Sequence, residues 1–203
     1  MRNWKKFLSS LSNVYSNIEM IEACKAAGLE ELHKINRYSS RHVFALNDKF
    51  VIKIARSRAG MYQNWNEINI AQYLGDQRKL SRNFAKINLD LSDECHGRFI
   101  VMERLTGATR KVAALLQHDK LPELVEAIDK VDKVMCMKNR QDLAGRQCGI
   151  DSNGRIKMLD YGANDQVLNM YMSARWAVAK RKGYPNNSSF RNPTEEDVIF
   201  SEQ

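Results

Sequence analysis

A lysine inside an apolar strand is the feature that most limits how this chain can fold. Residues 50–55 read Phe-Val-Ile-Lys-Ile-Ala, and an extended strand of this composition is apolar on both faces. Lys53 shares a face with Val51 and Ala55, where a lysine is costly to bury unless an anion meets it. The alternative is an edge strand, from which the long side chain reaches water.

The helix expected over residues 61–75 supplies a matching anion. Glu67 is spaced for the same helix face as Ile70 and Leu74, which makes it part of the apolar stripe. A carboxylate on a buried face and a lysine in an apolar strand explain each other if they form an ion pair. The alternative is a Glu67 that only borders the stripe and faces water.

Hydrophobic periodicity divides the chain into a mixed first half and a helical second half. Two short helices are expected within residues 4–27, ending at Gly28. The five expected strands lie at residues 32–35, 42–46, 50–55, 85–91 and 98–105, with the 61–75 helix inserted after the third. Further helices are expected at residues 110–118, 121–137 and 165–182, followed by a loose tail.

An Asn-Gly pair predicts a hairpin between strands at residues 148–151 and 155–160. A two-residue turn places Gln147 opposite Asp160, and opposed residues of an antiparallel ladder lie roughly 5 Å apart. The loop that carries Asp142 reaches the same end of the hairpin. Two carboxylates and an amide oxygen at one place suit Mg²⁺. The alternative is that these polar residues end strands and face water.

In chain order, these features resemble the motifs of the protein-kinase fold. The resemblance covers roughly residues 30 to 165. It rests on Val-Ile-Lys-Ile-Ala at 51–55 (the strand-three lysine), Glu67 (its helix partner), 98–105 (the hinge strand that receives adenine), Asp-Leu-Ala-Gly-Arg-Gln at 142–147 (the catalytic loop) and Leu-Asp-Tyr-Gly at 159–162 (the Asp-Phe-Gly metal motif). More narrowly, residues 39–44 and 60–67 resemble small kinase-like proteins of phages and bacteria with a truncated C-terminal lobe.

The resemblance implies an α+β, protein-kinase-like fold of two lobes. A five-stranded antiparallel N-lobe with one inserted helix would be followed by a reduced helical C-lobe. The corresponding division is a helical extension at residues 1–28, the N-lobe at 29–105, the C-lobe with its catalytic-loop hairpin at 106–184 and a tail at 185–203.

The resemblance also implies a site for ATP and Mg²⁺. Lys53, held by Glu67, would grip the α- and β-phosphates, and Asp142 would orient or deprotonate the acceptor hydroxyl. Gln147 and Asp160 would hold Mg²⁺, so Lys53, Asp142 and Asp160 form the implied catalytic set. The remaining nucleotide contacts fall on Ser39, Ser40 and Arg41 in the phosphate loop and on Met102, Glu103 and Leu105 in the hinge strand.

Some positions depart from the kinase pattern. The phosphate loop at residues 36–41 contains no glycine, so it is less free to close over a phosphate. Gln147 stands where the family has asparagine, and the segment after Gly162 is short for a full helical lobe that docks peptides.

Two functions therefore stay open. One is a minimal Mg²⁺-dependent phosphotransferase acting on a protein or small-molecule hydroxyl, and the other is a pseudokinase that binds a protein or nucleic acid without catalysis.

The net charge of +8 favours polyanionic partners such as nucleotide phosphates. In the last helix, Trp176 and its basic neighbours are a candidate nucleic-acid contact, although packing on the lobe is the simpler interpretation.

Four separated cysteines predict reduced thiols in or near the core. No apolar run approaches the roughly 20 residues of a membrane span. No membrane partner is therefore expected, and the expected location is the cytoplasm, or the host cytoplasm if the protein is viral.

Overall fold

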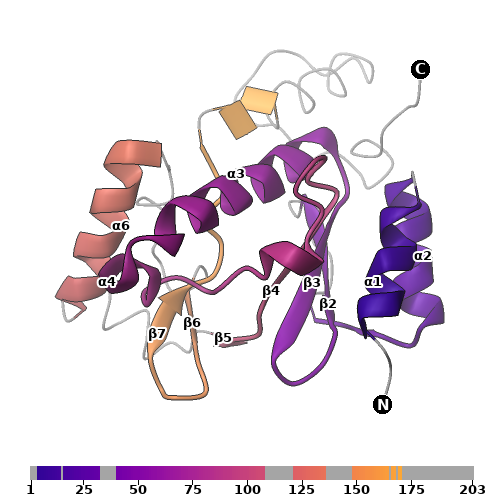
Figure 1. Ribbon diagram of the computed structural model, residues 1–203, viewed down its shortest axis with the longest axis horizontal. Helices are drawn as coiled ribbons and strands as arrows, with labels where there is room; N and C mark the ends of the chain where they lie inside the picture. The colour runs from indigo at the N-terminus through magenta and orange to yellow at the C-terminus, as the bar shows by residue number, and fades with distance from the viewer. Residues whose placement is uncertain are drawn as a thin grey trace, which may run out of the picture.

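The computed structural model describes most of the first half of the chain and the hairpin of the second half. The described residues are 4–14, 16–32, 40–107, 121–135, 148–164, 166–167 and 169–170. Within them the protein is α+β, as expected, with a four-stranded antiparallel sheet, a smaller three-stranded sheet and helices packed on both (Figure 1).

The larger sheet has the strand order β1-β2-β3-β4, and every pair is antiparallel. Its strands are β1 (Glu30–Glu31), β2 (Arg41–Ala45), β3 (Phe50–Ala55) and β4 (Phe99–Glu103). The predicted strand at 50–55 is therefore confirmed, and it lies inside the sheet between β2 and β4. The edge-strand alternative for Lys53 is wrong, because both sides of β3 are hydrogen-bonded to neighbours.

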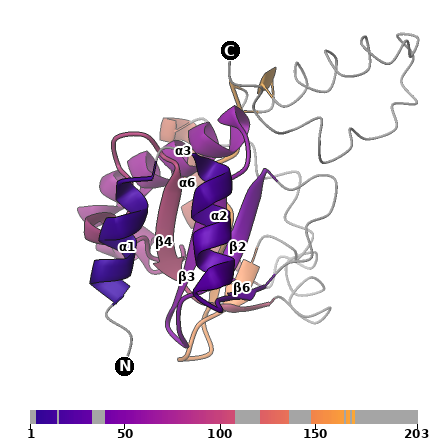
Figure 2. The same ribbon diagram turned by 90° about the vertical axis from the view of Figure 1, so that its right-hand side faces the viewer.

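Helices cover both faces of this sheet. Helix α3 (Arg58–Gly75) lies on one face, and α1 (Trp4–Ser12) and α2 (Asn17–Ala26) lie on the other, which faces the viewer in Figure 2. The alternation of β3 explains the two layers, since Val51 packs in the core on the α3 side and Ile52 packs with the residues of α1 and α2. A strand that is apolar on both faces is thus buried on both faces.

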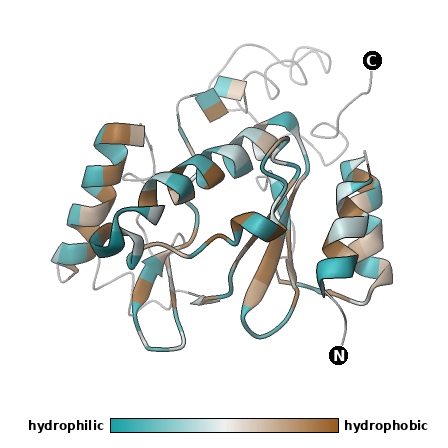
Figure 3. Cartoon of the chain, viewed as in Figure 1, coloured by the Kyte–Doolittle hydropathy of each residue, from teal (hydrophilic) through white to brown (hydrophobic). Residues whose placement is uncertain are grey.

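The smaller sheet carries the second part of the core. It consists of β5 (Thr106–Gly107), β6 (Cys148–Ile150) and β7 (Ile156–Met158), and helix α6 (Pro122–Met135) contributes to the same hydrophobic cluster. Figure 3 shows apolar and polar residues alternating along α6. The buried side chains of α6 recur at helical spacing, as the sequence predicts: Leu124, Ala127, Ile128 and Val131.

The strand predicted at residues 85–91 is wrong, and within the described residues the larger sheet has four strands where five were expected. Ala85 N donates to Met158 O of β7, whereas Asn88 N donates to Val101 O of β4. The segment crosses from one sheet to the other, so it never runs along a single partner long enough to form a ladder. It continues into a short 3₁₀ helix, η1 (Leu89–Leu91), and is preceded by the short helix α4 (Arg78–Ser81).

The predicted hairpin forms, but its predicted register is wrong by one residue. Cys148 pairs with Met158, where a two-residue turn would pair it with Leu159. The Asp151 carboxylate accepts hydrogen bonds from the backbone N–H groups of Asn153 and Arg155, each at 2.9 Å. This side-chain closure stabilises a longer loop than the Asn-Gly signal implies.

Several other predictions fall wholly or largely outside the described residues. These are the helix at 110–118, most of the helix at 165–182 and the tail at 185–203. Both N-terminal helices lie in the predicted 1–28 segment, and Gly28 adopts a positive φ of 67° after α2, as a helix-ending glycine should. Within the described part of the chain, no helix combines the length and apolarity needed to cross a bilayer.

Candidate functional site

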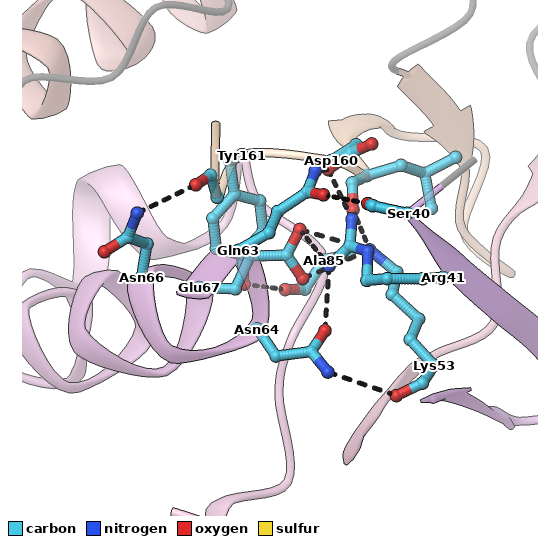
Figure 4. Close-up of polar contacts among 12 residues, drawn as sticks. Ser40, Arg41, Lys53, Gln63, Asn64, Asn66, Glu67, Ala85, Asp160 and Tyr161 are labelled. Atoms are coloured by element: carbon cyan, nitrogen blue, oxygen red, sulfur yellow. Dashed lines mark hydrogen bonds and ion pairs between the residues drawn. The ribbon is translucent and has the colours of Figure 1, made fainter. Parts of the chain in front are cut away.

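Lys53 and Glu67 form the buried ion pair that the sequence predicts. Lys53 Nζ lies 3.2 and 3.3 Å from the two Glu67 carboxylate oxygens and donates a 2.8 Å hydrogen bond to Leu159 O (Figure 4). Lys53 is 6% exposed and Glu67 is 0% exposed. The alternative of a Glu67 that borders the apolar stripe and faces water is therefore wrong.

The elements bring the two side chains together by ordinary packing. Lys53 points from β3 toward α3, and the helix can approach the sheet because Gly60 has no side chain. A Cβ on Gly60 would lie 2.3 Å from the carbonyl oxygen of Ser40. The side chain of Ser57 caps the helix by accepting a hydrogen bond from Gly60 N at 3.3 Å.

Arg41 joins this pair, a role that the sequence analysis missed. The phosphate-loop interpretation made Arg41 a hydrogen-bond donor to phosphate from a loop. In the structure Arg41 lies in strand β2 and is 6% exposed. Its Nη1 is 3.0 Å from Glu67 Oε1 and donates to Asn64 Oδ1 at 3.0 Å. The signal was present in the alternation of β2, since Arg41 and Val43 share a face and Val43 lies opposite Lys53.

Asp160 completes a charged cluster, defined here as Arg41, Lys53, Glu67 and Asp160. Asp160 Oδ1 accepts a 2.6 Å hydrogen bond from Arg41 Nη2 and a 2.7 Å hydrogen bond from Gln63 Nε2. The amide oxygen of Gln63 accepts in turn from Ser40 Oγ at 2.6 Å. Strand β2, helix α3 and the segment after β7 therefore meet at a single carboxylate (Figure 4).

Burial and neighbouring charges both shift the pKa values of this cluster. Burial alone would raise the pKa of Asp160, but the Arg41 guanidinium and the Lys53 ammonium hold that pKa well below its usual range. Burial raises the pKa of Glu67, although both cations oppose the shift. Burial also lowers the pKa of Lys53, and the nearby Arg41 adds to that effect. Asp160 is therefore the carboxylate most firmly held in its charged form.

The two residues after Asp160 fix its position against α3. Tyr161 is buried, donates its hydroxyl to Ala85 O at 2.9 Å and packs edge-on against Phe84. Gly162 touches the helix so closely that an added Cβ would lie 2.1 Å from Gln63 O. Packing of the Tyr161 ring and close contact of Gly162 with α3 thus hold the Asp160 carboxylate in place.

The hinge-strand residues make contacts that the sequence analysis did not anticipate. Met102 is buried in the core, and Leu105 is packed against the same cluster. The Glu103 carboxylate accepts hydrogen bonds of 2.8 and 2.9 Å from the buried Lys157, which also pairs with Asp151 at 3.1 Å. Glu103 therefore links the larger sheet to the hairpin, and the role of these three residues in adenine binding stays a prediction.

The structure describes the expected Mg²⁺ site only in part. Asp160 is the one expected ligand that the structure describes, and its Oδ1 already accepts hydrogen bonds from Arg41 and Gln63. Within the described ranges, no three His, Cys, Asp or Glu side chains are grouped to hold a metal. Gln147, Asp142 and Ser39 lie outside the described residues, as does Trp176. The hairpin register that was expected to place Gln147 opposite Asp160 differs by one residue, since Cys148 pairs with Met158.

Two cavities are lined by described residues. One of about 320 Å³ is lined by the end of α3, by residues 84–87 and by Tyr161. Another of about 570 Å³ lies between α4, the start of α6 and the hairpin turn. No residue of the charged cluster lines either one.

The cysteine prediction is correct for two residues and wrong for a third. Cys24 and Cys148 are buried free thiols, and burial raises their pKa to about 12 and about 11. Cys95 is a free thiol too, but it is exposed. Cys136 lies outside the described residues.

Comparison with known proteins adds no relative. The chain matches no family model, and it matches no curated protein. Functional inference therefore depends on the order of the motifs in the sequence and on the geometry of the charged cluster.

Proposed function

We propose that this protein binds ATP through a protein-kinase-like site in which Lys53, held by Glu67, contacts the phosphates. The observation that carries the proposal is the buried Lys53–Glu67 pair lying beside Asp160. Lys53 and Leu159, the residue before Asp160, are 106 positions apart in sequence, yet Lys53 Nζ donates directly to the Leu159 carbonyl oxygen. Strand lysine, helix glutamate and Asp-Tyr-Gly aspartate meet as they do in the family that the sequence resembles.

The energetics of buried charge support a functional role for this cluster. A buried ion pair is seldom more stabilising than apolar side chains of the same volume. Four charged side chains at one place, three of them almost fully buried, are therefore poorly explained by stability alone. The net charge of +8 further favours a polyanionic ligand.

Replacing Lys53 by Met should weaken ATP binding at least tenfold while leaving the fold intact. The Glu67 carboxylate keeps Arg41 at 3.0 Å, so the substitution does not leave a buried carboxylate without a cation. The measurement is a thermal-shift and calorimetric titration of the full chain with ATP. Wild-type protein at 100 times the dissociation constant should gain about 2.7 kcal/mol.

The control for this substitution is Lys130→Met. Lys130 is an exposed lysine paired with Glu126 on α6, so its replacement removes the same charge far from the cluster. ATP affinity should be unchanged in this variant. Equal affinities for wild type, Lys53→Met and Lys130→Met would contradict the proposed role of Lys53.

Binding without phosphate transfer is the mode that the contact between Arg41 and Asp160 favours. A Mg²⁺-dependent phosphotransferase needs Asp160 as a metal ligand, whereas here Asp160 Oδ1 accepts hydrogen bonds from Arg41 and Gln63. Under the pseudokinase proposal, Asp142→Asn should change neither ATP affinity nor ATP turnover. A turnover that falls 10²- to 10⁴-fold, on the order expected for a positioned base, would reinstate the phosphotransferase. Autophosphorylation and ATP hydrolysis assays measure the difference.

A further inference from the structure

Arg41 lies between the two carboxylates of the charged cluster. Its Nη1 is 3.0 Å from Glu67 Oε1, and its Nη2 donates a 2.6 Å hydrogen bond to Asp160 Oδ1 (Figure 4). The guanidinium is held in this orientation by Asn64, whose Oδ1 accepts from Nη1 at 3.0 Å. A single planar cation therefore meets both carboxylates at once.

A second donor occupies the same oxygen of Asp160. Gln63 Nε2 lies 2.7 Å from Asp160 Oδ1, and Ser40 Oγ donates to Gln63 Oε1, which turns the amide nitrogen toward the carboxylate. Mg²⁺ requires oxygen ligands at about 2.0–2.1 Å in near-octahedral geometry. An ion bound to Asp160 Oδ1 would have to displace both N–H donors. At this oxygen the protein places its own donors where the resemblance to kinases would place a metal.

The four residues of the cluster carry two positive and two negative charges. Arg41 and Lys53 contribute two positive charges, which face the two carboxylates of Glu67 and Asp160. A divalent cation added at Asp160 would lie beside a guanidinium and be repelled by it. The phosphates of a nucleotide bring the opposite charge and are attracted by both basic side chains.

We propose that Arg41 takes the place of the divalent cation at Asp160, so that this chain binds the polyphosphate of ATP without Mg²⁺. The inference rests on the proposed function. Phosphate approaches Arg41 and Lys53 from the side of Asp160, whose side chain is 33% exposed and is the most open of the four. Asp160 then orients Arg41, and no metal is needed to bridge protein and nucleotide.

The test is the ATP affinity of the full chain, measured calorimetrically in EDTA and in excess Mg²⁺. The two dissociation constants should agree within about threefold. Binding that requires Mg²⁺ would overturn this inference and leave the proposed function standing. Absence of binding in both buffers would overturn the proposed function, and the inference with it.

Arg41→Gln gives the matched variant. It should weaken ATP binding in EDTA by about tenfold or more, and Mg²⁺ should then restore part of the loss. Arg82→Gln is the control, because Arg82 is a half-exposed arginine paired with Glu123 outside the cluster, and its affinity should match wild type. Unchanged affinity of Arg41→Gln in EDTA would overturn the inference.

Asp160→Asn decides the question if Arg41→Gln does not fold. The substitution removes a carboxylate that faces the incoming phosphates, so ATP affinity in EDTA should stay the same or rise. If Mg²⁺ strengthens ATP binding by the wild-type protein but not by Asp160→Asn, Asp160 is a metal ligand. That outcome would overturn the replacement of the metal by Arg41.

Discussion

Glu67→Gln is expected to destabilise the protein by about 3–5 kcal/mol, the usual effect of removing one partner from a buried ion pair. Glu67 is fully buried and is the shared partner of Arg41 and Lys53. Without its charge, two nearly buried cations face the single carboxylate of Asp160. Denaturant unfolding of wild type and variant measures the loss as a shift of the midpoint at constant slope.

A double variant tests whether charge imbalance is the cause. Adding Lys53→Met to Glu67→Gln removes the surplus cation, so the double variant should be more stable than Glu67→Gln alone. Glu126→Gln is the matched control, because it neutralises a glutamate whose lysine partner is exposed, and it should leave the midpoint unchanged. A midpoint for Glu67→Gln equal to that of Glu126→Gln would contradict the buried-pair interpretation.

Gly162→Ala is the second substitution with a large expected effect, a destabilisation of about 3 kcal/mol from overpacking. The added Cβ would lie 2.1 Å from the carbonyl oxygen of Gln63 and 2.7 Å from Glu67 Cγ. The nearest of these atoms belongs to the backbone of α3, which cannot move aside as the end of a flexible side chain can. The Asp-Tyr-Gly segment would have to separate from the helix, and Asp160 would lose its hydrogen bond from Gln63.

Gly75→Ala provides the comparison for this prediction. Gly75 ends α3, and an added Cβ there meets no heavy atom within 4 Å. The substitution should therefore raise stability by up to about 1 kcal/mol, because alanine loses less backbone entropy than glycine on folding. Unfolding curves for the two variants should shift in opposite directions. A Gly162→Ala midpoint at or above wild type would show that the segment is not packed against α3 in solution.

Local sequence patterns determined the elements that carry the Lys53–Glu67 pair. The two-sided apolar run at residues 50–55 favoured a strand buried on both faces, and helical spacing predicted the buried face of α3. A buried lysine and a buried glutamate were then expected to meet, because each alone is unfavourable in an apolar interior. This part of the site follows from periodicities that extend over a few residues.

The contacts of Arg41 were decided by the tertiary structure. In the sequence, Arg41 follows a polar stretch and directly precedes the strand expected at residues 42–46. Its alternation with Val43 indicates a shared face, but not what Arg41 contacts there. Its burial depends on Asp160, which is 119 positions away and is seated by Tyr161 and Gly162 on α3. No local pattern encodes a contact of that range.

The same reason explains the errors in the second half of the fold. The alternating segment at residues 85–91 has the period of a strand, yet its backbone donors divide between β7 and β4. The hairpin register changed because the Asp151 carboxylate closes its loop, and the buried Lys157 pairs with Glu103 across the two sheets. The sequence by itself determined the buried faces of β3 and α3, and with them that Lys53 and Glu67 each needed a partner. The tertiary structure alone decided which partner each charge received, because that choice depends on surfaces brought together only after the elements pack.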